Sequence, residues 1–231
     1  MTLAVIPARG GSKRIPRKNI KPFCDKPMIG YAIEAALNSE LFENVIVSTD
    51  DEEIKEIAIQ FGAKVPFMRP PELSDDFAPT VPVIAHAIQH CDSFGYSVGE
   101  VCCIYPSVPF ISISDLKIAL DRLRVGDVEF VFPVAQYPSP IQRALLRSAD
   151  ATIQPFFREN VSKRTQDLEP SYFDVGQFYW GKGKSWQREL NLHLHSAAIE
   201  IPEWRAIDID TSADWDRAEL LFSAITERIQ S

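Results

Sequence analysis

Short apolar runs and amphipathic stretches alternate along the first 135 residues of the chain. Residues 3–7, 45–48, 101–105 and 130–134 are apolar runs of strand length, and residues 28–39 carry apolar side chains at helical spacing. Such alternation predicts parallel strands joined by right-handed crossovers, with helices on both faces of the sheet. The pattern therefore indicates a three-layer, Rossmann-like α/β fold whose ligands bind beyond the carboxyl ends of the strands.

Residues 137–205 break this alternation. They contain few helical periods, many aromatic residues and scattered turn residues, which predict antiparallel strands and loops that form a lid or an arm. Residues 206–211 then indicate a returning strand, and Thr211 with Asp214 fits a capping box at the start of a final amphipathic helix through Ile229. We therefore expect a single domain over residues 1–231, with an antiparallel arm at about 137–205 inserted in it.

The loop after the first expected strand concentrates positive charge. Residues 9–21 hold six of the chain's 24 basic residues and the first 24 residues contain no acid, although the formal net charge is -8. With Gly10 and Gly11 at its start, the loop can present backbone N–H groups and cationic side chains to a polyphosphate. The alternative is a solvated basic loop or a nucleic-acid patch, although the net acidic balance argues against wholesale nucleic-acid binding.

Two carboxylates lie close together near the end of the chain, in the sequence Asp208-Ile209-Asp210. On the expected strand 206–211, positions i and i+2 face the same way, so both carboxylates would converge on one point. Two hard oxygen donors beside a cationic phosphate loop suit Mg²⁺. The alternative is that one aspartate caps the following helix while the other is simply exposed.

Further polar residues lie at expected strand ends and in the aromatic region. Arg69 follows a short expected strand at 64–67, so it either donates to a base carbonyl or a phosphate, or belongs to a solvated loop. Tyr105 ends the strongest central strand, where substrate contact and a structural turn are equally compatible with the sequence. Among the aromatic residues of the arm, Arg164 or Arg143 is suited to bidentate pairing with a substrate carboxylate.

Other protein classes lack support in the sequence. No apolar run approaches the ~18–20 residues of a membrane span, and the start is strand-like, so we expect a soluble, cytoplasmic protein. The four cysteines show no CxxC spacing, which favours reduced thiols over disulfides or zinc. The absence of G-x-x-x-x-G-K-[ST] and G-x-G-x-x-G fingerprints weakens a P-loop ATPase or a hydride-transfer function.

Five motifs, in order along essentially the whole chain, resemble those of one enzyme family. The family is that of the cytidylyltransferases that activate nonulosonic acids, the CMP-sialic acid synthetases and their relatives. The motifs are residues 6–20, residues 69–73, Tyr105-Pro106-Ser107-Val108-Pro109, Arg164-Thr165-Gln166-Asp167-Leu168 and Asp208-Ile209-Asp210-Thr211. Within the family, residues 21–24, 51–54 and 176–181 are most similar to members that use pseudaminic acid.

The resemblance implies a Mg²⁺-dependent reaction of CTP with a nine-carbon 2-keto sugar acid. The nucleotide would be bound by Ala8, Arg9, Gly10, Gly11, Ser12, Lys13, Asn19, Arg69 and Thr80. The catalytic residues would be Arg9, Lys18, Asp208 and Asp210, the two aspartates being the metal ligands. The sugar acid would be bound by Tyr105, Arg143, Arg164, Tyr172 and Gln177. The family is usually homodimeric, so the arm at 137–205 would reach the partner's site.

Two positions depart from the family pattern. Sialic acid enzymes typically carry glutamine where Tyr105 stands, which argues against N-acetylneuraminic acid as the substrate. Asp25 stands where a glycine is usual and places an acid beside the basic loop. The alternatives are a cytidylyltransferase for another acidic sugar (N-acetylneuraminic, legionaminic or 3-deoxy-octulosonic acid) and, in a different class, a non-catalytic nucleotide-binding module.

Overall fold

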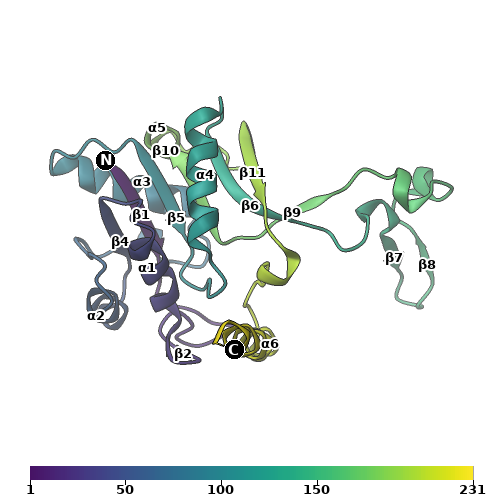
Figure 1. Cartoon of the computed structure of the whole chain (residues 1–231), viewed down its shortest axis with the longest axis horizontal. Helices are drawn as coiled ribbons and strands as arrows, with labels where there is room; N and C mark the ends of the chain where they lie inside the picture. Colours follow the sequence, from purple (N-terminus) through teal and green to yellow (C-terminus); the bar gives the residue numbers. More distant parts are fainter. Residues whose placement is uncertain (231) are drawn as a thin grey trace.

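A seven-stranded sheet forms the centre of the computed structural model, which describes residues 1–230 (Figure 1). The strand order is β11-β6-β10-β5-β1-β4, with β9 paired to β6. The strands are β1 (Thr2–Pro7), β4 (Asn44–Ser48), β5 (Glu100–Ile104), β6 (Phe130–Gln136), β9 (Tyr172–Asp174), β10 (Phe178–Lys182) and β11 (Ser196–Glu200). β9 and β10 run antiparallel to their neighbours and the other pairs are parallel, so the expected mostly parallel α/β fold is confirmed. Ser231, the last residue of the expected domain, lies outside the described residues.

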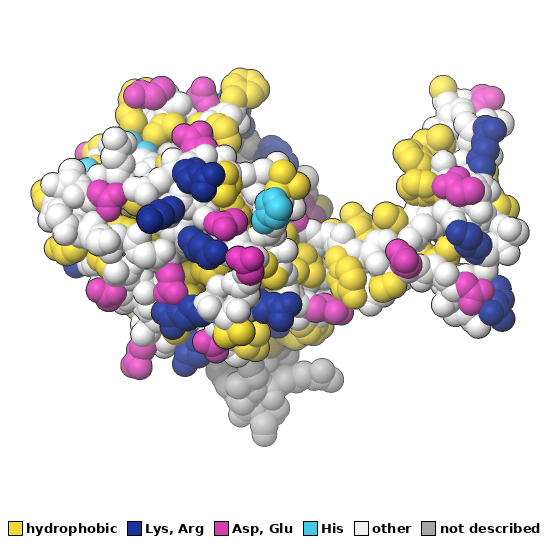
Figure 2. All heavy atoms as spheres, turned by 90° about the horizontal axis from the view of Figure 1, so that it is seen from above, with side chains coloured by type: hydrophobic (Ala, Val, Ile, Leu, Met, Phe, Trp, Pro, Cys, Tyr) yellow, Lys and Arg dark blue, Asp and Glu magenta, His cyan; other side chains and the backbone are white. Residues whose placement is uncertain are grey.

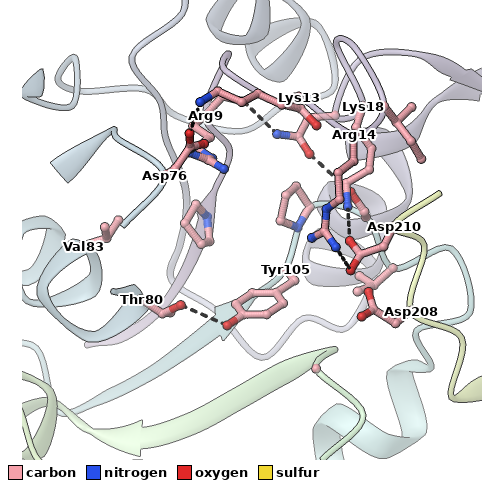
Figure 3. A pocket seen from close by; sticks show the side chains of 18 of the residues that line it. Arg9, Lys13, Arg14, Lys18, Asp76, Thr80, Val83, Tyr105, Asp208 and Asp210 are labelled. Carbon is pink, nitrogen blue, oxygen red and sulfur yellow. Dashed lines mark hydrogen bonds and ion pairs between the residues drawn. The ribbon is translucent and has the colours of Figure 1, made fainter. Parts of the chain in front are cut away.

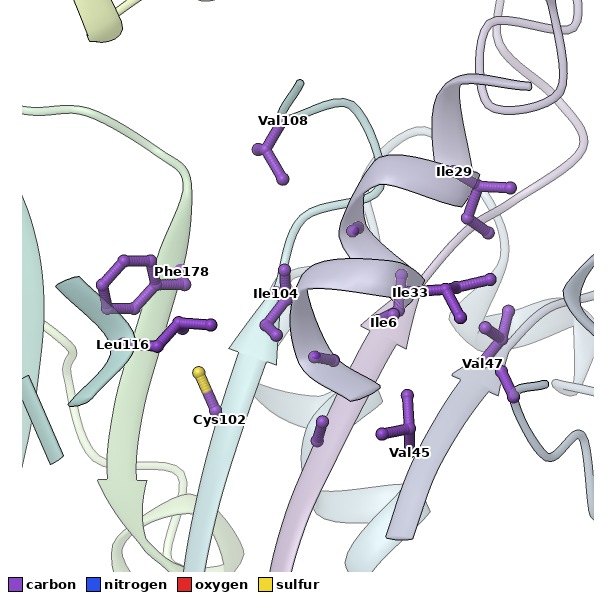
Figure 4. Packing of buried hydrophobic residues seen from close by; sticks show 14 of the residues in the cluster. Ile6, Ile29, Ile33, Val45, Val47, Cys102, Ile104, Val108, Leu116 and Phe178 are labelled. Carbon is purple, nitrogen blue, oxygen red and sulfur yellow. The ribbon is translucent and has the colours of Figure 1, made fainter. Parts of the chain in front are cut away.

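Helices cover both faces of this sheet. The helices are α1 (Met28–Asn38), α2 (Glu52–Gln60), α3 (Thr80–Ser93), α4 (Ile113–Val125) and α5 (Gly183–Gln187). Helices α1, α2 and α4 share one buried core with the sheet, part of which is shown in Figure 4, and α3 and α5 share the other. Successive strand residues alternate between the cores, so Cys102 of β5 belongs to the first and Cys103 to the second.

The C-terminal helix α6 (Ser212–Gln230) packs on a small hairpin formed by β2 (Pro22–Phe23) and β3 (Lys26–Pro27). Phe23 lies edge-on to Trp215 of this helix, with ring centroids 5.4 Å apart. The expected capping box is present, because Asp214 Oδ2 accepts from the Thr211 N–H (2.9 Å) and Thr211 Oγ1 accepts from the Asp214 N–H (3.2 Å). This packing brings the segment before α6 beside the cationic loop.

The chain between β6 and β9 leaves the sheet as a long projection, seen on the right of Figures 1 and 2. It contains the hairpin of β7 (Leu145–Arg147) and β8 (Ile153–Pro155) and the 3₁₀ turns η2 (Ile141–Arg143), η3 (Arg158–Asn160) and η4 (Thr165–Asp167). The projecting part is narrower than the expected arm at 137–205, because β10 and β11 return to the central sheet. β10 lies between β5 and β6 and is buried along most of its length.

Two expected strands do not form as strands. Residues 64–67 contribute an isolated bridge from Lys64 to Ile46, before the turn η1 (Pro71–Leu73). Residues 206–211 follow the turn η5 (Glu203–Arg205) as an irregular segment, so the expectation of a strand there was wrong, and the strand that returns to the sheet is β11. The physical reason is that Ile207 and Ile209 pack into the core between α6 and the hairpin, which produces a period of two without a partner strand.

None of the helices within the described residues combines the length and the apolar character needed to cross a bilayer.

Candidate functional site

One pocket of about 450 Å³ lies between the cationic loop, the ends of β1 and β5, and the segment before α6 (Figure 3). This is the carboxyl-end edge of the parallel strands, where sheets of this kind bind ligands. Ten of the expected site residues line it: Arg9, Ser12, Lys13, Lys18, Asn19, Arg69, Thr80, Tyr105, Asp208 and Asp210. The sequence motifs at four separate places in the chain therefore meet at one site.

The backbone of the cationic loop is held against the turn that follows β4. The Gly10 N–H donates to Asp50 Oδ1 (3.0 Å), and a Cβ on Gly10 would collide with the side chain of Asp51. Gly10 is thus required by this close approach, whereas the space around Gly11 is open. Ala8 is fully buried at the end of β1, so it, Gly10 and Gly11 shape the loop from outside the pocket lining.

Arg17 is a basic residue of the loop that does not line the pocket. Its guanidinium hydrogen-bonds Asp51 through two nitrogens and also pairs with Glu53. These contacts hold the pKa of Asp51 below its usual range, with the Arg17 hydrogen bond as the main cause. Arg17 also has a left-handed backbone (φ 57°), which is typical of a tight turn. Its ion pairs hold this turn of the loop in place. Lys21 does not line the pocket either, and its Nζ lies over the Trp215 ring. The other four cations, Arg9, Lys13, Arg14 and Lys18, line the pocket.

An acid from another loop occupies part of this cationic surface. Asp76 Oδ1 accepts from Arg9 Nη1 (2.6 Å), and its other oxygen pairs with Lys13. The hydrogen bonds from Lys13 and Arg9 hold the pKa of Asp76 below its usual range. Asp76 was not among the site residues expected from the sequence, because its only signal there was an acid in a loop that follows a strand-like segment.

Asp208 and Asp210 both line the pocket opposite the loop cations. Arg14 Nη1 lies 2.6 Å from Asp210 Oδ2, while Lys18 Nζ lies 3.5 Å from Asp210 Oδ1 and donates to the Ile209 carbonyl (2.8 Å). Burial, followed by the charge of Asp210, raises the pKa of Asp208. Since Thr211 and Asp214 make the helix cap, the capping alternative for these two aspartates was wrong.

This pair of carboxylates fits a divalent cation. A cation beside Asp208 and Asp210 would relieve the repulsion and the desolvation that raise the Asp208 pKa. Among the described residues, no group of three or more His, Cys, Asp or Glu side chains forms a complete metal cage. Two carboxylates suit Mg²⁺, which binds through one or two protein carboxylates and completes its coordination with water and substrate phosphates.

Arg69 is a buried guanidinium at the pocket wall. It is only 6% exposed, its Nε and Nη2 have no hydrogen-bond acceptor among the described residues, and the nearest carboxylate oxygen, on Asp50, lies 3.8 Å from Nη2. Burial lowers the pKa of Arg69. Since unsatisfied buried donors are costly, this side chain is suited to a ligand that supplies an acceptor oxygen or nitrogen.

Polar side chains of the pocket wall hold one another in place. Asn19 Nδ2 donates to the Arg9 carbonyl (3.0 Å), and its Oδ1 accepts from Ser107 (3.2 Å). Thr80 Oγ1 and the Tyr105 hydroxyl are 2.9 Å apart. Burial raises the pKa of Tyr105 to about 12, so its hydroxyl remains protonated at neutral pH.

The other four expected sugar-binding residues do not line this pocket. Gln177 is buried and donates from its amide to the Arg205 carbonyl (2.6 Å). Arg143 holds the arm together by donating to the carbonyls of Val161 and Lys163. Arg164 is exposed and pairs with Asp167, and Tyr172 is exposed where the arm joins the sheet.

Comparisons with known proteins identify the family of the chain. The cytidylyltransferase family model matches residues 3–164. The pseudaminic acid cytidylyltransferase of Campylobacter jejuni is 41% identical over 95% of both chains, and the CMP-N,N'-diacetyllegionaminic acid synthase of Legionella pneumophila is 31% identical over 98% of both chains. A solved CMP:2-keto-3-deoxy-manno-octonic acid synthetase has the same fold, with a TM-score of 0.70, 17% identity and coverage of 96% of this chain and 98% of that one. The resemblance drawn from the sequence motifs is confirmed, and the chain belongs to the cytidylyltransferase family.

Proposed function

We propose that the protein transfers CMP from CTP to the anomeric hydroxyl of a nonulosonic acid, with pseudaminic acid as the preferred sugar. The observation that carries this proposal is the pocket itself, where four cationic side chains face two carboxylates and a buried arginine, two of whose nitrogens have no acceptor among the described residues. Cationic side chains and a metal site suit a nucleoside triphosphate. The names of the relatives given above indicate cytosine as its base and nonulosonic acids as the class of sugar. Use of CTP would place the reaction in the cytoplasm.

In the proposed reaction, the anomeric oxygen attacks the α-phosphorus of CTP. A bond forms between these atoms, the bond from the α-phosphorus to the bridging oxygen breaks, pyrophosphate leaves, and the proton of the hydroxyl passes to solvent. Arg9, Lys13, Arg14 and Lys18 would hold the triphosphate and neutralise the charge that develops on its oxygens. Asp208 and Asp210 would hold Mg²⁺, which supplies further neutralisation when bound with the phosphates.

The remaining wall of the pocket suits the base, the ribose and the sugar acid. Arg69 would donate to a cytosine acceptor, because its buried Nε and Nη2 need one. Asn19 and Thr80 would lie near the base and ribose. Tyr105 would lie on the sugar-acid side, between Thr80 and Asp208 as Figure 3 shows. Arg164 on the arm would pair with the sugar carboxylate in a second copy of the chain.

Pyrophosphate release from CTP tests the proposal, with a panel of pseudaminic, legionaminic, N-acetylneuraminic and 3-deoxy-octulosonic acids and with or without Mg²⁺. We expect release only with a keto-sugar acid and Mg²⁺, and fastest with pseudaminic acid. Asp210→Ala should reduce the rate at least about 10- to 100-fold through loss of a metal ligand. Asp216→Ala, an exposed carboxylate on α6, is the matched control and should retain wild-type activity.

Two outcomes contradict the proposal. Absence of pyrophosphate with every sugar acid would overturn the enzymatic function and favour a nucleotide-binding module. Such a module would also bind CTP equally well after Asp208→Ala. Faster release with legionaminic or another acid would overturn the preference for pseudaminic acid and leave the reaction class intact.

A further inference from the structure

A group of side chains joined by hydrogen bonds and ring packing connects the pocket wall to the surface behind it. The Tyr105 hydroxyl at the pocket lies 2.9 Å from Thr80 Oγ1, and the Tyr105 ring packs against Tyr179 with centroids 5.6 Å apart. The Tyr179 hydroxyl donates to Asp174 Oδ2 (2.9 Å), and His193 Nε2 lies 2.8 Å from the same oxygen. Three elements, β5, β9 and β10, are therefore joined behind Tyr105.

Asp174 also sets the backbone beside Tyr105. Its second oxygen, Oδ1, accepts from the Gly176 N–H (2.9 Å), and Gly176 lines the pocket with a left-handed backbone (φ 67°). The next residue, Gln177, accepts from the Tyr105 N–H through its carbonyl (2.9 Å). One carboxylate thus holds both the turn that encloses Tyr105 and the side chain on which Tyr105 packs.

The surroundings make these contacts rigid. Tyr179 is 5% exposed and packs between Tyr105 and Phe132, whose ring centroids lie 5.6 Å from its own. Burial raises the pKa of the Tyr179 hydroxyl, so it remains a donor to Asp174 at neutral pH. A buried phenol that donates to a carboxylate has few alternative partners, so its position is well defined.

From this geometry we propose that Asp174 is a positioning residue for the sugar-acid side of the site. Through Tyr179 and the Gly176 turn, it fixes the Tyr105 hydroxyl where it meets the bound sugar acid. This inference rests on the proposed function, because it assigns the sugar acid to the Tyr105 side of the pocket. It adds Asp174 and Tyr179, neither of which lines the pocket, to the residues that determine sugar recognition.

Tyr179→Phe and Asp174→Asn test the inference by steady-state kinetics with CTP and the best sugar of the panel. Both keep the size of the side chain. Tyr179→Phe removes the hydrogen bond from Tyr179 to Asp174, and Asp174→Asn weakens the contacts of this side chain with Tyr179, Gly176 and His193. We expect KM for the sugar acid to rise about 3- to 10-fold, which corresponds to the free energy of one buried hydrogen bond. KM for CTP should stay within about twofold of the wild-type value. In a double-mutant cycle, Tyr105→Phe and Tyr179→Phe should be non-additive, because both act on the same hydroxyl.

Tyr31→Phe is the matched control. The Tyr31 hydroxyl also donates to a carboxylate, Asp25 Oδ1 (2.8 Å), from a buried ring outside the pocket. Tyr31→Phe should lower the melting temperature by about as much as Tyr179→Phe does, and it should leave the KM values for the sugar acid and for CTP unchanged.

The outcomes separate this inference from the function on which it rests. If the wild type turns over and Tyr179→Phe leaves the sugar KM unchanged, or raises both KM values alike, the positioning role is overturned and the function stands. Additive effects in the cycle overturn it equally. If the wild type releases no pyrophosphate with any sugar acid, both proposals fail together.

Discussion

At the scale of single residues, Asp76 places a carboxylate on two of the cations that we assign to the triphosphate. The two carboxylate oxygens of Asp76 contact Arg9 and Lys13, and these contacts hold the loop of Asp76 against the cationic loop. We propose that a triphosphate bound by Arg9 and Lys13 would displace Asp76. The acid would then compete with the nucleotide and lower its affinity.

We predict that Asp76→Asn strengthens the binding of CTP about two- to fivefold at low salt. This factor corresponds to the free energy that an exposed ion pair typically contributes. The measurement is isothermal titration calorimetry with CTP in the absence of sugar, repeated at high salt, where screening should reduce the difference. Asp75→Asn is the matched control. It changes the charge by the same amount one residue away, and its amide oxygen can still accept from the N–H groups of Phe77 and Ala78. Equal effects of the two variants would contradict direct competition.

The sequence predicted which types of residue form the site better than it predicted how they pair. The cationic loop was identified because it follows a strand and begins with two glycines, and the resemblance to the family selected Arg9, Lys13 and Lys18 within it. The separate role of Arg17 was not identified, because its partner Asp51 lies 34 positions further along the chain. Asp76 is 67 positions from Arg9, and local spacing carries no information about such pairs.

At the scale of elements, the segment that carries Asp208 and Asp210 is held at both ends by charged groups. Before it, Arg205 of η5 pairs with Asp115 in the first turn of α4. After it, the capping box of Thr211 with Asp214 starts α6. The sequence predicted this capping box correctly because it is local. It predicted a strand at 206–211 wrongly because burial of alternate side chains does not require a neighbouring strand.

The pair of Asp115 and Arg205 should be important for stability. The side chains are 10% and 15% exposed, so removing one partner leaves the other as a nearly buried, unpaired charge. We predict that Asp115→Ala lowers the free energy of unfolding by roughly 2–4 kcal/mol. Urea unfolding followed by circular dichroism measures this change.

Asp121→Ala provides the control for Asp115→Ala on the same helix. Asp121 is exposed in the middle of α4, so its removal should change the free energy of unfolding by less than about 0.5 kcal/mol. A change below about 1 kcal/mol in Asp115→Ala would show that Arg205 finds solvent or another partner. The segment before α6 would then be held mainly by the packing of Ile209 and Trp215.

At the scale of the whole molecule, the arm is the part whose apolar side chains are not buried against the rest of the chain. Its exposed large apolar residues are Ile141, Leu145, Leu146, Ile153, Phe156 and Val161, and Figure 2 shows hydrophobic side chains along this projection. The sequence predicted an arm from its aromatic, aperiodic composition. It did not predict that β10 returns to the centre of the sheet, since strand order depends on contacts between distant segments.

We propose that a second copy of the chain covers these apolar residues, so that the arm of each protomer reaches the pocket of the other. The position of Arg164 supports this arrangement. It lies on the arm, is exposed and does not line the pocket of its own chain. A role in binding the sugar carboxylate therefore requires that Arg164 act in the partner's pocket.

We predict that two variants with strongly reduced activity, Arg164→Ala and Asp210→Ala, restore activity when they pair. In a mixed dimer, the intact pocket of the first chain faces the intact arm of the second, so one of the two sites is complete. Mixed dimers, co-expressed with two different affinity tags and purified on both, should show about half of the wild-type rate of pyrophosphate release per dimer.

The matched control pairs the wild type with the double variant Arg164→Ala/Asp210→Ala. Here the intact pocket faces the altered arm, so a dimer with exchanged arms has no complete site and should be inactive. If Arg164 instead acts on its own chain, the two results reverse: the control dimer keeps half of the activity and the first mixed dimer has none. The two dimers contain the same set of substitutions and differ only in how they are distributed. Their comparison therefore determines whether the site is built from one chain or from two, independently of any effect of the substitutions on stability.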